Sequence, residues 1–345
     1  MGTEDVIIKP VILSVVVPVY NEEAVVEICY KRTSAALSSI EAKHEIIFID
    51  DGSSDSTVSK VRSLHQLDSR VKLICLSRNF GKEIAVSAGL DFASGEAVIV
   101  LDADLQDPPE LIPEMVAKWR EGYDTVYGKR ANREGESHLK KLTAKVFYRV
   151  MAQMSHINIP EDTGDFRLLS RRTIEALKLV REQHRFMKGL FSWVGFRQTG
   201  LVYNREPRIA GRTKWNYFKL FNFAVEGITS FSHVPIRIAS YCGLFTSILA
   251  LLYAVFLILR TLIFGRDVAG YASLMVAILF FSGLQLLFLG VLGEYLGRTF
   301  DEAKRRPLYL IQDIVGLSTN ELVFLSEKGF HGERDRLPLS QENRW

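Results

Sequence analysis

Four short apolar segments alternate with helix-forming segments over the first hundred residues. Residues 11–19, 45–49, 71–76 and 97–101 are dominated by Val, Ile and Leu, the composition of strands that are buried on both faces. Each strand is followed by a segment with capping and helix-forming residues. This alternation predicts an α/β fold, with a mostly parallel sheet, right-handed crossovers and helices on both faces.

Weaker patterns extend this prediction towards the C-terminus. Residues 124–128 and 202–203 have the composition of strands, and a helix is expected from Gln183 through Trp193. A further strand is expected over residues 305–311. The charged segment 312–345 is expected to be either a flexible tail or a strand exchanged between subunits.

Two segments without a charged residue, 238–259 and 268–293, are the strongest compositional feature. Each exceeds the roughly 20 apolar residues that cross a bilayer, so a transmembrane hairpin is expected; the alternative is a pair of buried core helices. Basic residues are more frequent outside the pair than in the turn, which places both long ends in the cytoplasm. The outer ends carry Arg237, Arg298, Lys304, Arg305 and Arg306, and the turn carries Arg260 and Arg266.

Two more segments have the pattern of helices that lie in a membrane interface. Residues 139–157 place apolar side chains at helical spacing between lysines and arginines, and residues 214–233 are rich in aromatics. A core helix with one wet face is the alternative for the first. We therefore expect a cytoplasmic domain over 1–213, a juxtamembrane helix over 214–233, two transmembrane helices over 235–298 and a cytoplasmic tail over 299–345.

Charge and cysteine usage narrow the classes of function. A net charge of +3 over 345 residues is too small to indicate nucleic-acid binding. Cys29, Cys75 and Cys242 are scattered, which fits a reducing compartment and argues against a thiol-ligated metal. Residues 1–10 lack an apolar core, so no signal peptide is expected there.

Polar clusters follow all four of the first strands, and sheets of this type bind ligands beyond the carboxyl ends of their strands. The clusters contain Pro18, Tyr20 and Glu22, then Asp50 and Asp51, then Arg78 and Asn79, and finally Asp102 and Asp104. Neither a G-x-G-x-x-G nor a G-x-x-x-x-G-K-[ST] motif occurs. A dinucleotide site of the usual pattern and a P-loop ATPase are therefore not expected.

Asp102 and Asp104 flank one alanine at the end of an apolar strand. Buried carboxylates without partners are costly, and adjacent like charges raise each other's pKa. A bound cation removes both problems, and hard oxygen ligands suit Mg²⁺ or Mn²⁺. The alternative is a solvated acidic turn in which Asp107 caps the helix that begins at Pro108.

Together these motifs resemble those of the family 2 glycosyltransferases of the GT-A (Rossmann-like) fold. The resemblance rests on VPVYNEE at residues 17–23, DDGSSDST at 50–57 and DADLQDPP at 102–109. The last motif and the two apolar segments are most similar to the polyisoprenyl-phosphate glycosyltransferases, the relatives of dolichyl-phosphate mannose synthase and of bacterial polyprenyl-phosphate glucosyltransferases. The resemblance covers residues 13–306.

The resemblance implies a role for each motif on the donor side. A divalent cation, Mg²⁺ or Mn²⁺, would be held directly by Asp104, and Asp102 would lie beside the ribose or the metal. The nucleotide sugar would be bound by Pro18, Tyr20, Glu22, Asp50, Asp102, Ala103 and Gln106. For Asp51 two roles are open, a ligand contact or a turn acid that holds backbone amides. For Asp107 the two roles are an active-site contact or the cap of the following helix.

Other residues are implied on the acceptor side. Arg130 and Arg133 would clamp the phosphate of the acceptor, with a solvated loop as the alternative. Asp165, in the TGDFRLL stretch, would be a positioning group or a weak base. The alternative is an ion pair between Asp165 and Arg167 with a purely structural role. A loop containing Arg208 and Lys214 would fold over the diphosphate, so that Asp104, Asp165, Arg208 and Lys214 form the implied catalytic set.

The implied reaction is an inverting transfer of a sugar to polyprenyl phosphate at the inner membrane. UDP-glucose is the first expectation for the donor, with GDP-mannose or UDP-aminoarabinose as alternatives. The rival from another class is an idle membrane scaffold of the same fold. The expected partners are the nucleotide sugar, the lipid and the membrane, and homo-oligomerisation is left open.

Overall fold

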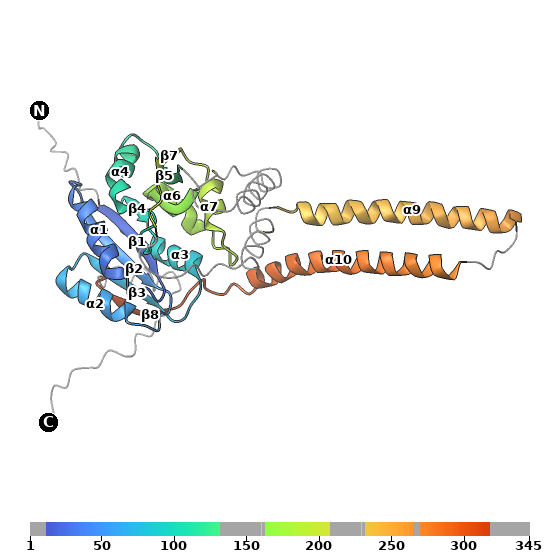
Figure 1. The fold of residues 1–345 in the computed structure, drawn as a ribbon, viewed down its shortest axis with the longest axis horizontal. Helices are drawn as coiled ribbons and strands as arrows, with labels where there is room; N and C mark the ends of the chain where they lie inside the picture. Colours follow the sequence, from blue (N-terminus) through green and yellow to red (C-terminus); the bar gives the residue numbers. More distant parts are fainter. Residues whose placement is uncertain are drawn as a thin grey trace, which may run out of the picture.

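The computed structural model describes residues 12–131, 160, 163–207, 229, 232–264 and 270–317. Within these ranges, one α/β domain carries two long helices that project from it side by side (Figure 1). The expected interfacial helices, 139–157 and most of 214–233, lie outside the described residues, as does the tail beyond residue 317.

One eight-stranded sheet, in the order β7-β5-β6-β4-β1-β2-β3-β8, forms the centre of the domain. Strands β3, β2, β1 and β4 run parallel to one another, as the apolar segments predict. These strands are β1 (Ile12–Val19), β2 (Lys43–Asp50), β3 (Val71–Leu76) and β4 (Ala97–Val100). The expected α/β fold with a parallel core is confirmed.

The other four strands make the sheet mixed. Strand β6 (Thr163–Ser170) lies between β4 and β5 (Thr125–Arg130) and is antiparallel to both. Strand β7 (Gln198–Tyr203) runs parallel to β5, and β8 (Ile311–Val315) runs antiparallel to β3. The strands expected at 124–128 and 202–203 are therefore present.

The expected strand at 305–311 is misplaced. Arg305 has a left-handed backbone (φ 49°), and the Tyr309 side chain is buried against the domain instead of alternating with its neighbours along a sheet. The strand begins only at Ile311. Because β8 pairs with β3 of the same chain, residues 311–315 are part of the sheet and neither a free tail nor an exchanged strand.

Helices cover both faces of the sheet, as predicted, because the side chains of each buried strand alternate between two cores. One core contains α1 (Val26–Ser38), α2 (Thr57–Leu67) and α4 (Ile112–Arg120), the last preceded by a 3₁₀ turn, η1 (Pro109–Leu111). The other contains α3 (Lys82–Phe92), α6 (Arg171–Leu179) and α7 (Met187–Trp193). The helix expected from Gln183 begins at Met187.

Helices α9 (Val234–Phe264) and α10 (Tyr271–Ala303) match the two uncharged segments. Both are long and apolar enough to cross a membrane, and the most apolar stretch of each helix is not buried inside the protein. They are therefore not core helices, the alternative that the sequence left open. An apolar surface of this extent requires a non-aqueous environment or a partner.

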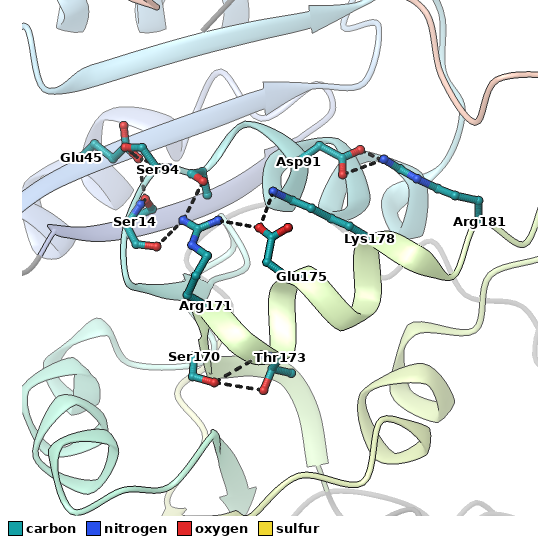
Figure 2. A network of polar contacts seen from close by, with 12 residues as sticks. Ser14, Glu45, Asp91, Ser94, Ser170, Arg171, Thr173, Glu175, Lys178 and Arg181 are labelled. Carbon is teal, nitrogen blue, oxygen red and sulfur yellow. Dashed lines mark hydrogen bonds and ion pairs between the residues drawn. The ribbon is translucent and has the colours of Figure 1, made fainter. Parts of the chain in front are cut away.

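After α10 the chain returns to the domain and is fixed there. The buried Tyr309 hydroxyl donates to Asp91 Oδ2 on α3 (2.8 Å). Asp91 also accepts two hydrogen bonds from Arg181, at 2.7 and 3.0 Å, as Figure 2 shows. Ser77 donates its backbone N–H to Leu310 (2.9 Å), next to the start of β8. The hairpin is thus held to the sheet on its C-terminal side.

A buried polar network closes the edge of the sheet where the parallel strands begin (Figure 2). Glu45 is buried and accepts from Ser14 Oγ (2.5 Å) and from Ser94 N (2.9 Å), and it forms an ion pair with Lys72 (2.7 Å). Burial alone would raise the pKa of Glu45, but Lys72 and Ser14 outweigh it and lower the pKa. This carboxylate is satisfied within the fold, so it has a structural role.

Candidate active site

The opposite edge of the sheet gathers the predicted site residues. Asp50 ends β2, Asp102 follows β4, and Arg130 ends β5. Because β6 runs antiparallel to β4, its first residues, including Asp165, reach the same edge. Side chains that are far apart in the sequence are therefore brought together by strand direction.

The loops after β1 and β2 are joined by hydrogen bonds between backbone N–H groups of one loop and side chains of the other. Asn21, in the left-handed region (φ 53°), donates its N–H to Ser53 Oγ (2.9 Å) and accepts from Ser54 N (2.8 Å). Glu22 donates its N–H to Thr57 Oγ1 (2.9 Å). Pro18, in β1, is half-buried, and Tyr20, directly after β1, is exposed. Both predicted nucleotide-binding residues therefore lie next to a junction that hydrogen bonds hold in place.

Asp50 and Asp51 are both buried, but they have different partners. Asp50 accepts from Ser53 N (3.1 Å) through Oδ2, and its buried Oδ1 receives no hydrogen bond from the described residues. Asp51 accepts from the N–H groups of Phe80 (2.7 Å) and Gly81 (2.9 Å). Burial raises the pKa of Asp51 despite these two hydrogen bonds. Asp51 is the turn acid that holds backbone amides, which leaves Asp50 as the residue for the predicted ligand contact.

Successive side chains of the D-A-D turn, residues 102–104, point alternately to the core and towards the surface. Ala103 and Leu105 are buried, whereas Asp102 and Asp104 are half-buried. Leu105 has a left-handed backbone (φ 55°), which is strained for a residue with a branched side chain. Gln106 N donates to Asp104 Oδ1 (3.2 Å). Since the Ala103 side chain packs in the core, only its backbone is left for the predicted contact with the nucleotide sugar.

Lys82 joins Asp102 to Asp165. Val100 of β4 lies opposite Arg167 of β6, so continuing this register by two residues brings Asp165 opposite Asp102. Like charges opposite each other destabilise a sheet. The Lys82 ammonium, at the first residue of α3, lies 2.7 Å from Asp102 Oδ1 and also contacts Asp165 Oδ2. It therefore compensates the repulsion between the two carboxylates.

The electrostatics of this cluster follow from burial and from its cations. Burial alone would raise the pKa of Asp165, but Lys82 and Lys188 outweigh it and hold that pKa well below its ordinary value. For Asp102, burial exceeds the effect of Lys82 and the pKa is raised. Burial, with a contribution from Asp165, raises the pKa of Glu83 to about 7. An ionised, ion-paired Asp165 is poorly suited to act as a base near neutral pH.

Arg167 does not form the ion pair that the sequence left open for it. Its guanidinium lies 3.9 Å from the centre of the Phe191 ring and donates to the Gly164 carbonyl (2.8 Å). Lys82 is the ion-pair partner of Asp165 instead. Burial lowers the pKa of Arg167 to about 10, because this side chain is enclosed between β6 and α7.

Asp107, Tyr203 and Arg130 form a second cluster. Tyr203 donates its hydroxyl to the buried Asp107, and a Cβ at Gly164 would lie 3.3 Å from both Asp107 Oδ2 and Arg130 Nη2. The turn η1 has Pro108 at its N-cap position and no side-chain cap, so the proposed capping role of Asp107 is wrong. Burial alone would lower the pKa of Arg130, but the hydrogen bond with Tyr203 and the charge of Asp107 outweigh it and raise that pKa.

The segment after β7 is attached to the D-A-D turn. Glu206 donates its N–H to the Gln106 carbonyl (3.0 Å), and Arg205 donates to Gln106 Oε1. Arg32 on α1 also binds Glu206 (2.8 Å). The predicted nucleotide-sugar contact Gln106 thus has a position fixed by its neighbours. Arg133, Arg208 and Lys214 lie outside the described residues.

The sequence did not identify Lys82 or Tyr203 as parts of this site, and it placed Lys188 only near an expected acceptor loop. Lys82 lies in R-N-F-G-K, just after a strand, and only Arg78 and Asn79 of this stretch belong to the predicted polar cluster. No local pattern marks Tyr203 or pairs Lys188 with Asp165, because the residues of each pair are more than 20 positions apart in the sequence. The assembled edge combines half-buried carboxylates with cations, an arrangement that suits binding of a phosphorylated ligand together with a cation.

Comparison with known proteins agrees with this arrangement. Residues 14–178 match the family model described as "Glycosyl transferase family 2". A prophage bactoprenol glucosyl transferase homologue of Escherichia coli K12 is 49% identical over 304 residues, which are 88% of this chain and 99% of the relative. The bactoprenol glucosyl transferase of Shigella phage SfV is 47% identical over 301 residues, 87% of this chain and 98% of its own.

One further sequence relative and one solved structure complete the comparison. An uncharacterized glycosyltransferase of Synechocystis is 55% identical over 305 residues, 88% of this chain and 96% of its own. Among solved structures, mannosyl-3-phosphoglycerate synthase of Rubrobacter xylanophilus matches 63% of this chain and 71% of its own at 18% identity and a TM-score of 0.44. The chain belongs to glycosyl transferase family 2 and is a glycosyltransferase with the GT-A type of α/β fold predicted from its sequence.

Proposed function

We propose that this enzyme transfers glucose from UDP-glucose to polyprenyl phosphate, with inversion at the anomeric carbon. The observation that carries the proposal is the edge where Asp102, Lys82 and Asp165 meet, in a chain 47–49% identical to bactoprenol glucosyl transferases over nearly their full length. The product would be polyprenyl-phosphate-glucose, and UDP would leave.

The donor would bind along the ends of β1, β2 and β4. Tyr20 and Glu22 would face the nucleotide, and the unsatisfied Oδ1 of Asp50 would accept a hydrogen bond from the base or ribose. Arg208 and Lys214 would close over the diphosphate, since the segment leading to them is held at Gln106.

A divalent cation, Mg²⁺ or Mn²⁺, fits the donor set at Asp104 and Asp102. Among the described residues no group of three His, Cys, Asp or Glu is arranged to hold a metal, so the protein would supply two carboxylates and the diphosphate the rest. Mg²⁺ is commonly bound in this way. A bound cation would supply charge neutralisation at the leaving diphosphate.

The acceptor would provide its own nucleophile. A phosphate monoester is largely dianionic at neutral pH, so one of its oxygens can attack without a protein base. The new bond joins that oxygen to the anomeric carbon, while the bond from this carbon to the diphosphate breaks on the opposite face. Arg130, with Arg133 in the following segment, would hold the acceptor phosphate, and Asp165 would orient the cations around it.

Helices α9 and α10 would place the site at the membrane. We expect a two-span hairpin in the inner membrane with the domain in the cytoplasm, because basic residues are more frequent at the outer ends of the helices. The division into a catalytic domain (1–213), a juxtamembrane helix (214–233), the spans (235–298) and a C-terminal segment (299–345) remains a prediction.

Sugar transfer in membranes that contain the full chain tests the proposal. Radiolabelled UDP-glucose, GDP-mannose and UDP-aminoarabinose are each offered with undecaprenyl phosphate and Mg²⁺ or Mn²⁺, and lipid-linked label is counted. We expect label from UDP-glucose, its loss in Asp104→Ala and its retention in Asp313→Ala, a matched change on the exposed side of β8. Label from another donor alone would replace the assignment to glucose, and no label from any donor would favour an idle scaffold.

A further inference from the structure

Lys82 is a cation at a position that does not favour one. It is the first residue of α3, and the N-terminus of a helix favours negative charge. The backbone there is fixed, because Asp51 accepts from the N–H groups of Phe80 and Gly81 just before it. A lysine held at this point is explained by what its ammonium meets and not by the stability of the helix.

The ammonium of Lys82 lies at the open side of the cluster. The Lys82 side chain is 42% exposed, compared with 26% for Asp102 and 14% for Asp165. An ammonium carries three hydrogen-bond donors, and the two carboxylates engage it from the protein side. A ligand that approaches from solvent therefore meets a positive charge that is already oriented.

Cation binding at Asp102 and Asp104 would change the partners of Lys82. Two cations sharing one carboxylate repel each other, so Lys82 would lose part of its interaction with Asp102. Asp165 Oδ1 is buried and receives no hydrogen bond from the described residues, so Asp165 can keep the ammonium in place. A donor of Lys82 then becomes available to an anionic ligand.

We propose that Lys82 binds the phosphate of the lipid acceptor, with Asp165 as its positioning residue. This inference rests on the proposed function and adds to it a residue that contacts the nucleophilic phosphate. Lysine is a common phosphate ligand that acts as a point charge. One lysine would thus compensate the two carboxylates before substrate arrives and bind phosphate afterwards.

The acceptor is favoured over the donor diphosphate by the surroundings of Asp165. Lys188 on α7 acts electrostatically on the same carboxylate, so two cations converge there. The loop before α7 contacts the end of α10, through Gln183 N and Glu302 (2.6 Å) and through His184 and Asp301 (3.0 Å). Figure 1 shows α7 and α3 on the side of the domain that faces the two long helices, from which a lipid would arrive.

The first experiment measures substrate kinetics of the full chain with Lys82→Met, which keeps most of the length of the side chain and removes its charge. We expect the KM for undecaprenyl phosphate to rise about 10- to 100-fold, the range for loss of a hydrogen bond to a charged group, with the KM for the donor within about twofold. Lys118→Met is the matched control, since Lys118 on α4 forms an ion pair with the exposed Glu121. A rise confined to the donor KM, or no rise, would overturn the proposal.

The second experiment needs no substrate. Mn²⁺ binding to the purified chain with saturating UDP is measured by titration calorimetry, and Lys82→Met should bind Mn²⁺ about tenfold more tightly than wild type, because a competing cation is gone. Equal or weaker binding would contradict the placement of Lys82. If wild type transfers no sugar to the lipid, the proposed function fails while this measurement still decides whether Lys82 competes with the cation.

A third variant covers a failure of Lys82→Met to fold. Lys82→Arg keeps the charge, and we expect a KM for the lipid between those of wild type and Lys82→Met, with thermal unfolding close to wild type. A lipid KM in Lys82→Arg as high as that of a variant without the charge would argue against phosphate binding.

Discussion

Arg32 on α1 links two carboxylates beside the active site. It binds Glu110 in η1 at 2.7 and 2.9 Å, and Glu206 at 2.8 and 3.0 Å. Glu206 also donates its N–H to the carbonyl of Gln106. Because Glu206 comes directly before the segment with Arg208 and Lys214, we predict that Arg32→Ala loosens the start of the loop proposed to close over the diphosphate.

The size of the effect follows from exposure and geometry. The Arg32 side chain is 25% exposed, Glu206 41% and Glu110 56%, so these are surface pairs, worth about 0.2 to 1 kcal/mol each. Both pairs are bidentate, which puts them near the upper end of that range and gives about 2 kcal/mol together. If only the Glu206 pair acts on the loop, about 1 kcal/mol remains. The expected loss in kcat/KM for the nucleotide sugar is therefore about 5- to 30-fold.

Steady-state kinetics with the donor varied and the lipid saturating would measure this loss. Arg70→Ala is the matched control, because Arg70 also forms a bidentate pair, with Asp68, away from the site. We expect Arg70→Ala to change kcat/KM less than twofold. The difference between Arg32→Ala and wild type should shrink at about 1 M salt, where the Debye length is about 3 Å. If Arg32→Ala stays within twofold of Arg70→Ala, the assigned role of Arg32 is wrong.

Two further predictions concern stability. Hydrogen bonds from Arg70 and Tyr30 lower the pKa of Asp68 to about 2, below the ordinary 3.8, so its stabilisation is complete above pH 3.8 and is lost as the pH falls through 2. Asp68→Asn should therefore cost about 2 kcal/mol at pH 7 and much less near pH 2, by thermal unfolding in detergent; an equal cost at both pH values would contradict this. Tyr203→Phe leaves the buried Asp107 without its hydroxyl donor, so we expect a loss of about 1 to 3 kcal/mol and a lower Tm, and an unchanged Tm would refute it.

Local sequence was enough to determine the parallel core and the apolar helices. The segments that became β1 to β4 are mostly apolar and contain Val or Ile at several positions, a pattern typical of strands buried on both faces. The uncharged segments became α9 and α10 because their length and composition favour one conformation whatever surrounds them. Asp102 and Asp104 were placed correctly at the end of β4, since strand order and strand direction follow from the strand–helix alternation.

Only the tertiary structure decided the partners of these carboxylates. Strand β6 enters the sheet antiparallel between β4 and β5, which brings Asp165 opposite Asp102 although 63 positions separate them in the sequence. Lys82 then meets both, and Tyr203 meets Asp107, across distances that no local pattern encodes. Likewise β8 joins β3 only after the chain has passed through both long helices. Such pairings depend on the energy of the whole sheet, so a sequence read segment by segment predicts Asp102 and Asp165 but not that Lys82 joins them.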